Sequence, residues 1–174
     1  MFGIIEKDVL KDILRELILI EKDRQAVKED MADLKLEFGT LVNKKMVSKI
    51  LKVGLRKGLK EYEVDEYILA CQMLGVSFPC NVYVPKDVDL TEEMREHRKR
   101  LNSLIERYKN LQDEHNEFSV QIRNQYAIAK AKGISVPMLK KAVDFCLHPD
   151  KLREYYDNNP LLESYVNVVE EMGN

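Results

Sequence analysis

Two apolar seams, 91 residues apart, constrain the fold of this chain more than any other feature. Steps of three and four residues from Leu10 trace the first seam, which passes through Leu10, Ile13, Leu17, Ile20, Arg24, Val27, Met31, Leu34 and Phe38. The same steps from Leu101 trace the second, through Leu101, Leu104, Tyr108, Leu111, His115, Phe118, Ile122, Gln125 and Ala129. Arg24, the one polar residue of the first seam, aligns with His115. Such a heptad pattern predicts two long helices with an apolar stripe each.

The similarity continues beyond the seams with an offset of 92 residues. Val42, Met46, Val47, Lys49, Leu51 and Leu55 align with Ile134, Met138, Leu139, Lys141, Val143 and Leu147. Each part then ends alike, with a tyrosine eight residues before a glycine (Tyr67 and Gly75, Tyr165 and Gly173). Two readings are open, a tandem duplication or a chance likeness of amphipathic helices, and we favour duplication. It predicts a first repeat over residues 1–75, an extended linker over 76–90 and a second repeat over 91–174.

Each repeat is expected to form a long helix, a turn and two shorter helices, which makes the fold class all-α. The expected helices cover residues 6–38, 44–57 and 64–74 in the first repeat and 92–132, 136–147 and 160–172 in the second. Thr91 is a plausible N-cap, Gly133 ends the fourth helix, and Pro149 follows the fifth. Pro79 and Pro85 predict an extended linker.

The two seams are expected to bury each other within one chain, as an intramolecular coiled-coil pseudo-dimer. We expect a parallel pairing, because an extended linker of up to about 50 Å can carry the chain back along a seam of about 44 Å. Parallel pairing places Arg24 beside His115, where both are expected to fix the register of the coiled coil, although a functional role is also open.

Composition excludes several classes of protein. The 174 residues are 33% charged, and the three cysteines include no Cys-x-x-Cys pair, so we expect reduced thiols and neither disulfides nor a zinc site. The three histidines are scattered, and no glycine-rich phosphate loop or nucleophile motif is present. We therefore expect no enzyme, metal, cofactor or small-molecule substrate. With neither a secretory leader nor a membrane span in view, a cytoplasmic protein is expected.

Basic residues gather in the same place in both repeats, although the formal net charge is −2. No acidic residue lies between Glu37 and Glu61 or between Glu117 and Asp144. These windows supply the candidate DNA-binding residues Lys44, Lys45, Lys49, Lys52, Arg56, Lys130, Lys132, Lys140 and Lys141. A lysine-rich helix face is often only a solvated surface, but two related faces suit the phosphates of a nucleic acid.

The second repeat resembles the GapR-like family of bacterial nucleoid-associated proteins. The resemblance covers most of residues 101–173 and is carried by the Tyr-Ala-x-Ala-Lys-x-x-Gly pattern from Tyr126 to Gly133 and by the Leu-Lys-Lys run that ends at Lys141. It implies binding of duplex DNA without sequence specificity, by dimers that assemble further. The positions that match the family's phosphate-contacting lysines are Lys130, Lys140 and Lys141.

The first repeat departs from the family pattern, with Lys35 in place of the tyrosine and Gly39 in place of the lysine. We expect an architectural DNA-binding protein of the nucleoid that acts as a homodimer of pseudo-dimers. The alternative is a coiled-coil interaction module that engages or antagonises another helical or DNA-binding protein.

Overall fold

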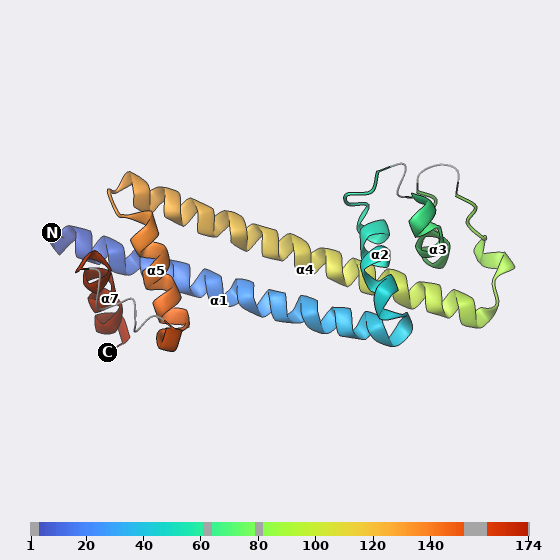
Figure 1. The fold of residues 1–174 in the computed structure, drawn as a ribbon, viewed down its shortest axis with the longest axis horizontal. Coiled ribbons are helices and arrows are strands. Elements are labelled where there is room, and N and C mark those ends of the chain that lie inside the picture. The colour runs from blue at the N-terminus through green and yellow to red at the C-terminus, as the bar shows by residue number, and fades with distance from the viewer. Residues whose placement is uncertain (1–3, 61–63, 79–81, 152–159, 174) are drawn as a thin grey trace. The chain divides into compact units, whose positions relative to one another are not determined.

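The computed structural model describes the whole chain except residues 1–3, 61–63, 79–81, 152–159 and 174. Its elements are α1 (Ile4–Leu41), α2 (Lys44–Leu55), α3 (Val64–Leu74), η2 (Asp87–Asp89), α4 (Glu92–Ala131), α5 (Val136–Leu147), η3 (Pro149–Lys151) and α7 (Pro160–Gly173) (Figure 1). No strand occurs in the part of the chain that the structure describes. The prediction of an all-α fold is confirmed, and each expected helix is present.

Capping side chains and a glycine explain where the helices begin and end. The side chain of Asn43 accepts a hydrogen bond from the backbone N–H of Lys45, 3.1 Å away, and caps α2. The hydroxyl of Thr91 accepts the backbone N–H of Met94 at 3.2 Å, which confirms the predicted cap of α4. Beyond the other end of α4, Gly133 adopts a φ of 79°, in the left-handed region that glycine enters at little cost.

The chain divides into two compact units, each built from parts of both predicted repeats. Unit 1 comprises Met1–Val27 and Glu114–Asn174, so it contains the beginning of α1, the end of α4, α5 and α7. Unit 2 comprises Lys28–Asp113, with the end of α1, α2, α3 and the beginning of α4. The repeat boundaries proposed from the sequence remain a prediction.

The prediction that the long helices pair in parallel is wrong. In unit 2 the end of α1 packs on the beginning of α4, with Glu37 and Arg107 joined at 3.2 Å, and in unit 1 the beginning of α1 packs on the end of α4. The helix segments within each unit therefore run antiparallel (Figure 1). The physical reason lies in the linker, which is fastened to the end of α3 instead of returning along α1.

Arg98 of α4 makes that attachment. Its guanidinium donates to the backbone carbonyls of Gln72 and Met73 at the end of α3, at 2.5 and 3.3 Å. It also donates to the carbonyl of Pro85 at 3.0 Å and to the carboxylate of Asp87 at 2.9 Å, both in the linker. The side chain is only 9% exposed. Because the linker folds back here, α4 begins beside the end of α3 and runs antiparallel to α1.

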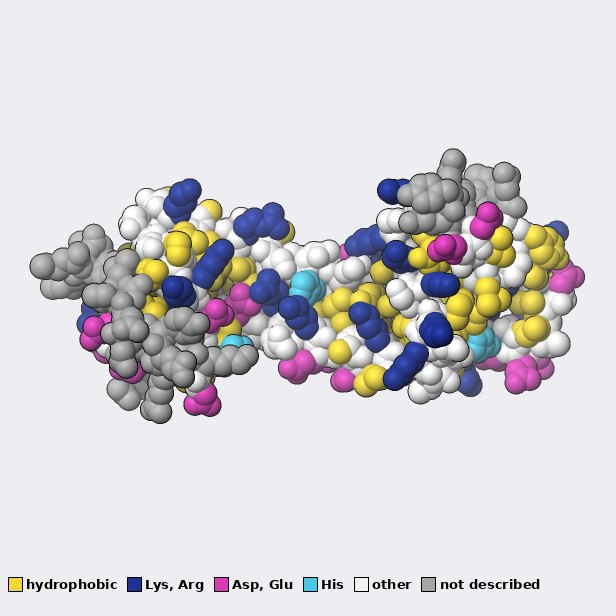
Figure 2. Space-filling model, viewed as in Figure 1, with side chains coloured by type: hydrophobic (Ala, Val, Ile, Leu, Met, Phe, Trp, Pro, Cys, Tyr) yellow, Lys and Arg dark blue, Asp and Glu magenta, His cyan; other side chains and the backbone are white. Residues whose placement is uncertain are grey.

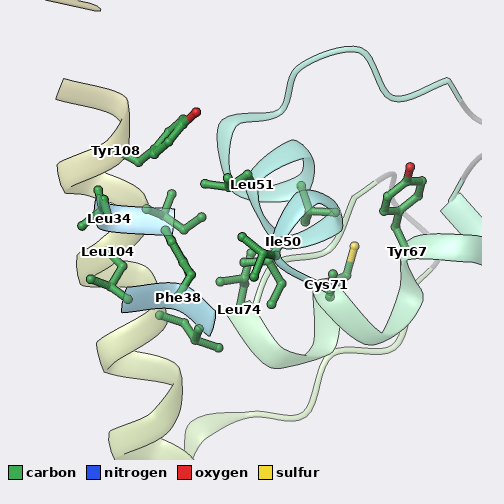
Figure 3. Packing of buried hydrophobic residues seen from close by; sticks show 14 residues of the cluster. Leu34, Phe38, Ile50, Leu51, Tyr67, Cys71, Leu74, Leu104 and Tyr108 are labelled. Atoms are coloured by element: carbon green, nitrogen blue, oxygen red, sulfur yellow. The ribbon is translucent and has the colours of Figure 1, made fainter. Parts of the chain in front are cut away.

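The core of unit 2 is formed by both long helices together with α2 and α3 (Figure 3). Phe38 from α1 and Ile50 from α2 are fully buried, and Leu101 from α4 joins them. These residues lie on the apolar faces that the sequence predicts, and the hydrophobic effect of burying them holds α2 against the pair of long helices.

The core of unit 1 repeats this arrangement with other elements. Leu10 and Leu17 of α1 pack with Leu139 of α5 and with Tyr165 of α7. Tyr165 is 1% exposed, and its hydroxyl accepts a hydrogen bond from the backbone N–H of Ser135 at 2.9 Å. The tyrosine thus joins α7 to the turn before α5, and it has no surface with which to stack on a base.

Candidate nucleic-acid interface

The sequence-predicted basic residues of the first half lie on and just after α2, in unit 2. We call them the α2 surface: Lys44, Lys45, Lys49, Lys52 and Arg56. All except the half-buried Lys49 are exposed. The opposite face of the helix buries Val47, Ile50, Leu51 and Val53. The amphipathic pattern of α2 therefore turns its lysines outward while its apolar residues hold the helix on the core.

An aromatic ring orders two of these lysines. The ammonium nitrogens of Lys49 and Lys52 each lie 5.8 Å from the centre of the Tyr67 ring of α3. Tyr67 is 9% exposed, so its ring is fixed in the core. A cation at this distance over an aromatic face is attracted by the ring quadrupole. This contact gathers two positive charges at one point of the α2 surface.

Arg56 stands where α2 ends, and its backbone is strained. Its φ of 52° and ψ of 38° place it in the left-handed region, where a residue with a side chain is disfavoured. Its own N–H donates to the carbonyl of Val53 at 3.1 Å, and the N–H of Lys57 donates to the carbonyl of Lys52 at 3.2 Å. These bonds satisfy the last carbonyls of α2 and turn the chain away from it.

The predicted residues of the second half lie in unit 1, and we call them the α5 surface: Lys130, Lys132, Lys140 and Lys141. All four are exposed. Lys130 is in the last turn of α4, where a positive charge suits the helix dipole, and Lys140 and Lys141 are on α5. The ammonium nitrogen of Lys140 lies 5.3 Å from the centre of the Tyr126 ring of α4.

The charge around Tyr126 differs from that around Tyr67. The pKa of the Tyr126 phenol is raised to about 12, chiefly by burial and then by the carboxylates of Glu21 and Asp144, while Arg24 acts in the opposite direction. Two acidic groups thus act on the ring that Lys140 covers. The electrostatic surroundings of the α5 surface are therefore mixed, although its four lysines form no ion pair with any carboxylate that the structure describes.

Lysine and arginine side chains gather over α2 in unit 2 and over α5 and the adjoining part of α4 in unit 1 (Figure 2). Two lysines that are not among the candidate residues lie beside the α2 surface, Lys35 of α1 and Lys57 after α2. Lys35 lies over the ring of Tyr108, 5.8 Å from its centre, and Lys57 donates to the side chain of Gln112 at 2.8 Å. Lys57 belongs to the acid-free window between Glu37 and Glu61, which is the signal that could have found it.

The two polar seam residues are brought near each other within unit 1, but not side by side as a parallel pair. Arg24 forms an ion pair with Glu21 at 2.7 Å and donates to the hydroxyl of Ser119 at 3.5 Å. That hydroxyl donates to the backbone carbonyl of His115 at 2.9 Å. The role of Arg24 and His115 in fixing the register remains a prediction.

Two searches of the described residues concern other classes of site. No group of three or more histidine, cysteine or acidic side chains in this part of the chain is placed to hold a metal ion. No helix found there combines the length and the apolar character that crossing a lipid bilayer requires.

Each unit is all-α and carries lysines clustered on an exposed helix face, which is the electrostatic feature expected of a nucleic-acid-binding domain. Residues 97–170 match the family model described as "GapR-like, DNA-binding domain". This part of the chain is thus similar to a family of DNA-binding domains, the family that the resemblance of the second repeat indicated. No curated protein and no solved structure gave a match. The matched residues include the whole α5 surface and none of the α2 surface.

Proposed function

We propose that this chain is an architectural protein of the bacterial nucleoid that binds duplex DNA through its phosphates, without reading the base sequence. The observation that carries the proposal is the position of Lys130, Lys132, Lys140 and Lys141: all are exposed, and all lie within the residues that match a DNA-binding family. According to this proposal, the α2 surface supplies further phosphate contacts.

Binding without sequence specificity follows from the chemistry of lysine. An ammonium group is a compact charge on a flexible stem, which suits phosphate oxygens but lacks the planar, bidentate donors that distinguish base edges. Phosphate contacts of this kind position a protein on DNA and contribute affinity that depends steeply on salt. A net charge of −2 adds no general attraction to DNA, so the local lysine surfaces must supply it.

The competing function, a coiled-coil module that engages another helical protein, has less support. The seam residues that such a partner would need are covered inside each unit, as Leu17 and Leu34 illustrate with 0% and 2% exposure. The proposal also includes association of two chains, which a measured solution mass tests directly.

The test is fluorescence anisotropy with a labelled random-sequence duplex of about 30 base pairs, titrated at several salt concentrations between about 50 and 200 mM. The wild type should bind at low salt. A variant with Lys140→Gln and Lys141→Gln loses two phosphate contacts, so the slope of log affinity against log salt should become shallower by about 2. The matched control is Lys86→Gln with Lys99→Gln, which removes two exposed lysines outside both surfaces.

Three outcomes are decisive. A shallower slope in the α5 variant but not in the control supports the proposal. No binding by the wild type at about 50 mM salt refutes DNA binding, and equal slopes in all three proteins would refute the α5 surface as the place of contact.

A further inference from the structure

A basic groove lies in unit 2, next to α2. It has a volume of about 530 Å³ and is lined by α1, α2, the segment after α2, and α4. Its polar lining consists of four lysines and three neutral groups, and it includes no carboxylate: Lys35, Lys44, Lys52, Lys57, Ser48, Tyr108 and Gln112. A volume of this size is within the range of ligand-binding sites in proteins.

The lysines of the groove are positioned, and no carboxylate neutralises them. Tyr108 is buried and holds the Lys35 ammonium over its ring, while Gln112 accepts a hydrogen bond from Lys57. Among the residues that the structure describes, none of the four lysines forms an ion pair. Glu37, two residues after Lys35 on α1, is paired with Arg107.

The beginning of α2 adds to the positive potential. Lys44 and Lys45 are its first residues, and no acidic residue is present in its first turn. A helix N-terminus carries a partial positive charge, so lysines there are unfavourable unless an anion is close. Asn43 already accepts hydrogen bonds from the backbone N–H groups of Lys45 and Met46 at this end, so an anion here would be held by the lysine ammonium groups and the helix dipole. The sequence thus retains a charge arrangement that a bound anion would relieve.

The aligned positions of the other half carry different side chains. The 91-residue and 92-residue offsets that align the two repeats place Tyr126 at the position of Lys35, Asp144 at that of Lys52, and Glu21 at that of Gln112. These three residues also interact in unit 1, where Glu21 and Asp144 both raise the pKa of Tyr126. Acidic and aromatic groups therefore occupy the positions that are basic or neutral in unit 2.

We infer that the groove of unit 2 binds a phosphodiester group of the DNA backbone between Lys35, Lys44, Lys52 and Lys57. This inference rests on the proposed function and extends it to a part of the chain that lies almost wholly outside residues 97–170. The groove gives the first half a phosphate contact of its own, different in position and composition from the α5 surface.

The test uses two double variants in the anisotropy titration described above. The groove variant carries Lys35→Gln together with Lys57→Gln, and the control carries Lys86→Gln together with Lys99→Gln. Both double variants lose two positive charges. Only the groove variant should become less sensitive to salt: between about 50 and 200 mM, the affinity of the wild type should fall about tenfold more than that of the groove variant. Circular dichroism at 222 nm confirms that both variants remain helical.

A second experiment distinguishes DNA phosphates from a small phosphate ligand, with inorganic pyrophosphate as the probe in a thermal unfolding assay. Unchanged affinity and salt slope in the groove variant, while the wild type binds DNA, would overturn the groove and leave the proposed function intact. If DNA binding is again unchanged in the groove variant, and pyrophosphate raises the unfolding temperature of the wild type but not of the groove variant, the groove binds a small phosphate ligand and the inference about DNA is overturned. A wild type that does not bind DNA overturns both proposals.

Discussion

Replacing Arg98 with alanine should destabilise unit 2 by about 3–4 kcal/mol. The guanidinium donates to three backbone carbonyls, those of Gln72, Met73 and Pro85, and each bond is taken at about 1 kcal/mol net, the value of an ordinary hydrogen bond and so a conservative one for a charged donor. The ion pair with Asp87 adds less than about 1 kcal/mol, because the carboxylate is 73% exposed and solvent screens it.

Water does not fully replace the hydrogen bonds that the carbonyls lose with the Arg98 side chain. The carbonyls of Gln72 and Met73 belong to the last turn of α3, where the helix supplies no N–H donors, although the carbonyl of Gln72 also accepts the backbone N–H of Gly75 at 3.3 Å. Arg98 is only 9% exposed, so its removal leaves these carbonyls in a site that water reaches poorly. The C-terminal end of α3 and the linker should therefore separate from α4 before the rest of the unit unfolds.

Urea unfolding followed by circular dichroism measures the change in free energy, and hydrogen exchange locates it. Amides of α3 should exchange faster in Arg98→Ala, while those of α5 and α7 should not change. Arg95→Ala is the matched control, because Arg95 is an exposed arginine on the same helix, and its loss should cost less than about 0.5 kcal/mol. If Arg98→Ala costs no more than the control, the idea that this side chain fastens the linker is wrong.

Four further predictions concern single side chains. Gly75→Ala should cost about 1–2 kcal/mol in urea unfolding, because Gly75 has a φ of 73° and a Cβ there would lie 2.9 Å from the guanidinium of Arg98. Because the folded pKa of Tyr126 is raised to about 12, its contribution to stability is complete below pH 10 and is lost as pH rises through 12, so Tyr126→Phe should unfold less readily in that alkaline range. Burial raises the pKa of the Cys146 thiol to about 11, so it should react with iodoacetamide at pH 8 several-fold more slowly in the native protein than in urea. Asp144→Asn should strengthen DNA binding in the anisotropy assay without steepening its salt slope, because it removes a negative charge near the α5 surface and adds no cation.

The sequence predicted the helices well because their ends depend on local chemistry. Thr91 caps α4 and Gly133 follows its end, so both boundaries are encoded within a few residues. Heptad periodicity likewise identified the buried face of each long helix. These are signals that a residue and its near neighbours carry, and they need no knowledge of the tertiary structure.

Helix direction was predicted wrongly because an apolar seam is compatible with both orientations. The linker was long enough for a parallel return, and its length alone could not exclude the antiparallel arrangement. The deciding contact is that of Arg98 with the end of α3, which joins residues about 25 positions apart and follows no periodic pattern. A buried arginine cannot be distinguished from an exposed one by type alone.

The groove was missed for a similar reason. Lys35 belongs to α1, Lys57 follows α2, and Tyr108 belongs to α4, so only the tertiary fold brings them together. Charge counting did find the acid-free window that contains Lys57, yet the candidate residues ended at Arg56. In the second half, counting lysines also failed to show that Asp144 acts on the ring covered by Lys140.

One comparison supports the duplication independently of the seams. In unit 2, Arg98 and Asn102 of α4 both bind backbone carbonyls at the end of α3. The positions 91 residues earlier are Lys7 and Lys11 of α1, and in unit 1 both form ion pairs with Glu171 near the end of α7, at 2.8 and 3.4 Å.

Each long helix therefore uses the same two positions to hold the last turn of a third helix, although the side chains and the acceptors differ. Unrelated amphipathic helices would share a heptad phase, but they have no reason to share this polar contact at a fixed offset. The two units differ at this contact and at the groove. Unit 2 has a buried arginine and a lysine-lined groove, whereas unit 1 has a partly exposed ion pair, and carboxylates at the positions aligned with the groove. A shared pair of positions with different side chains is what the predicted duplication would leave, and the side chains around the groove differ between the halves in the same way.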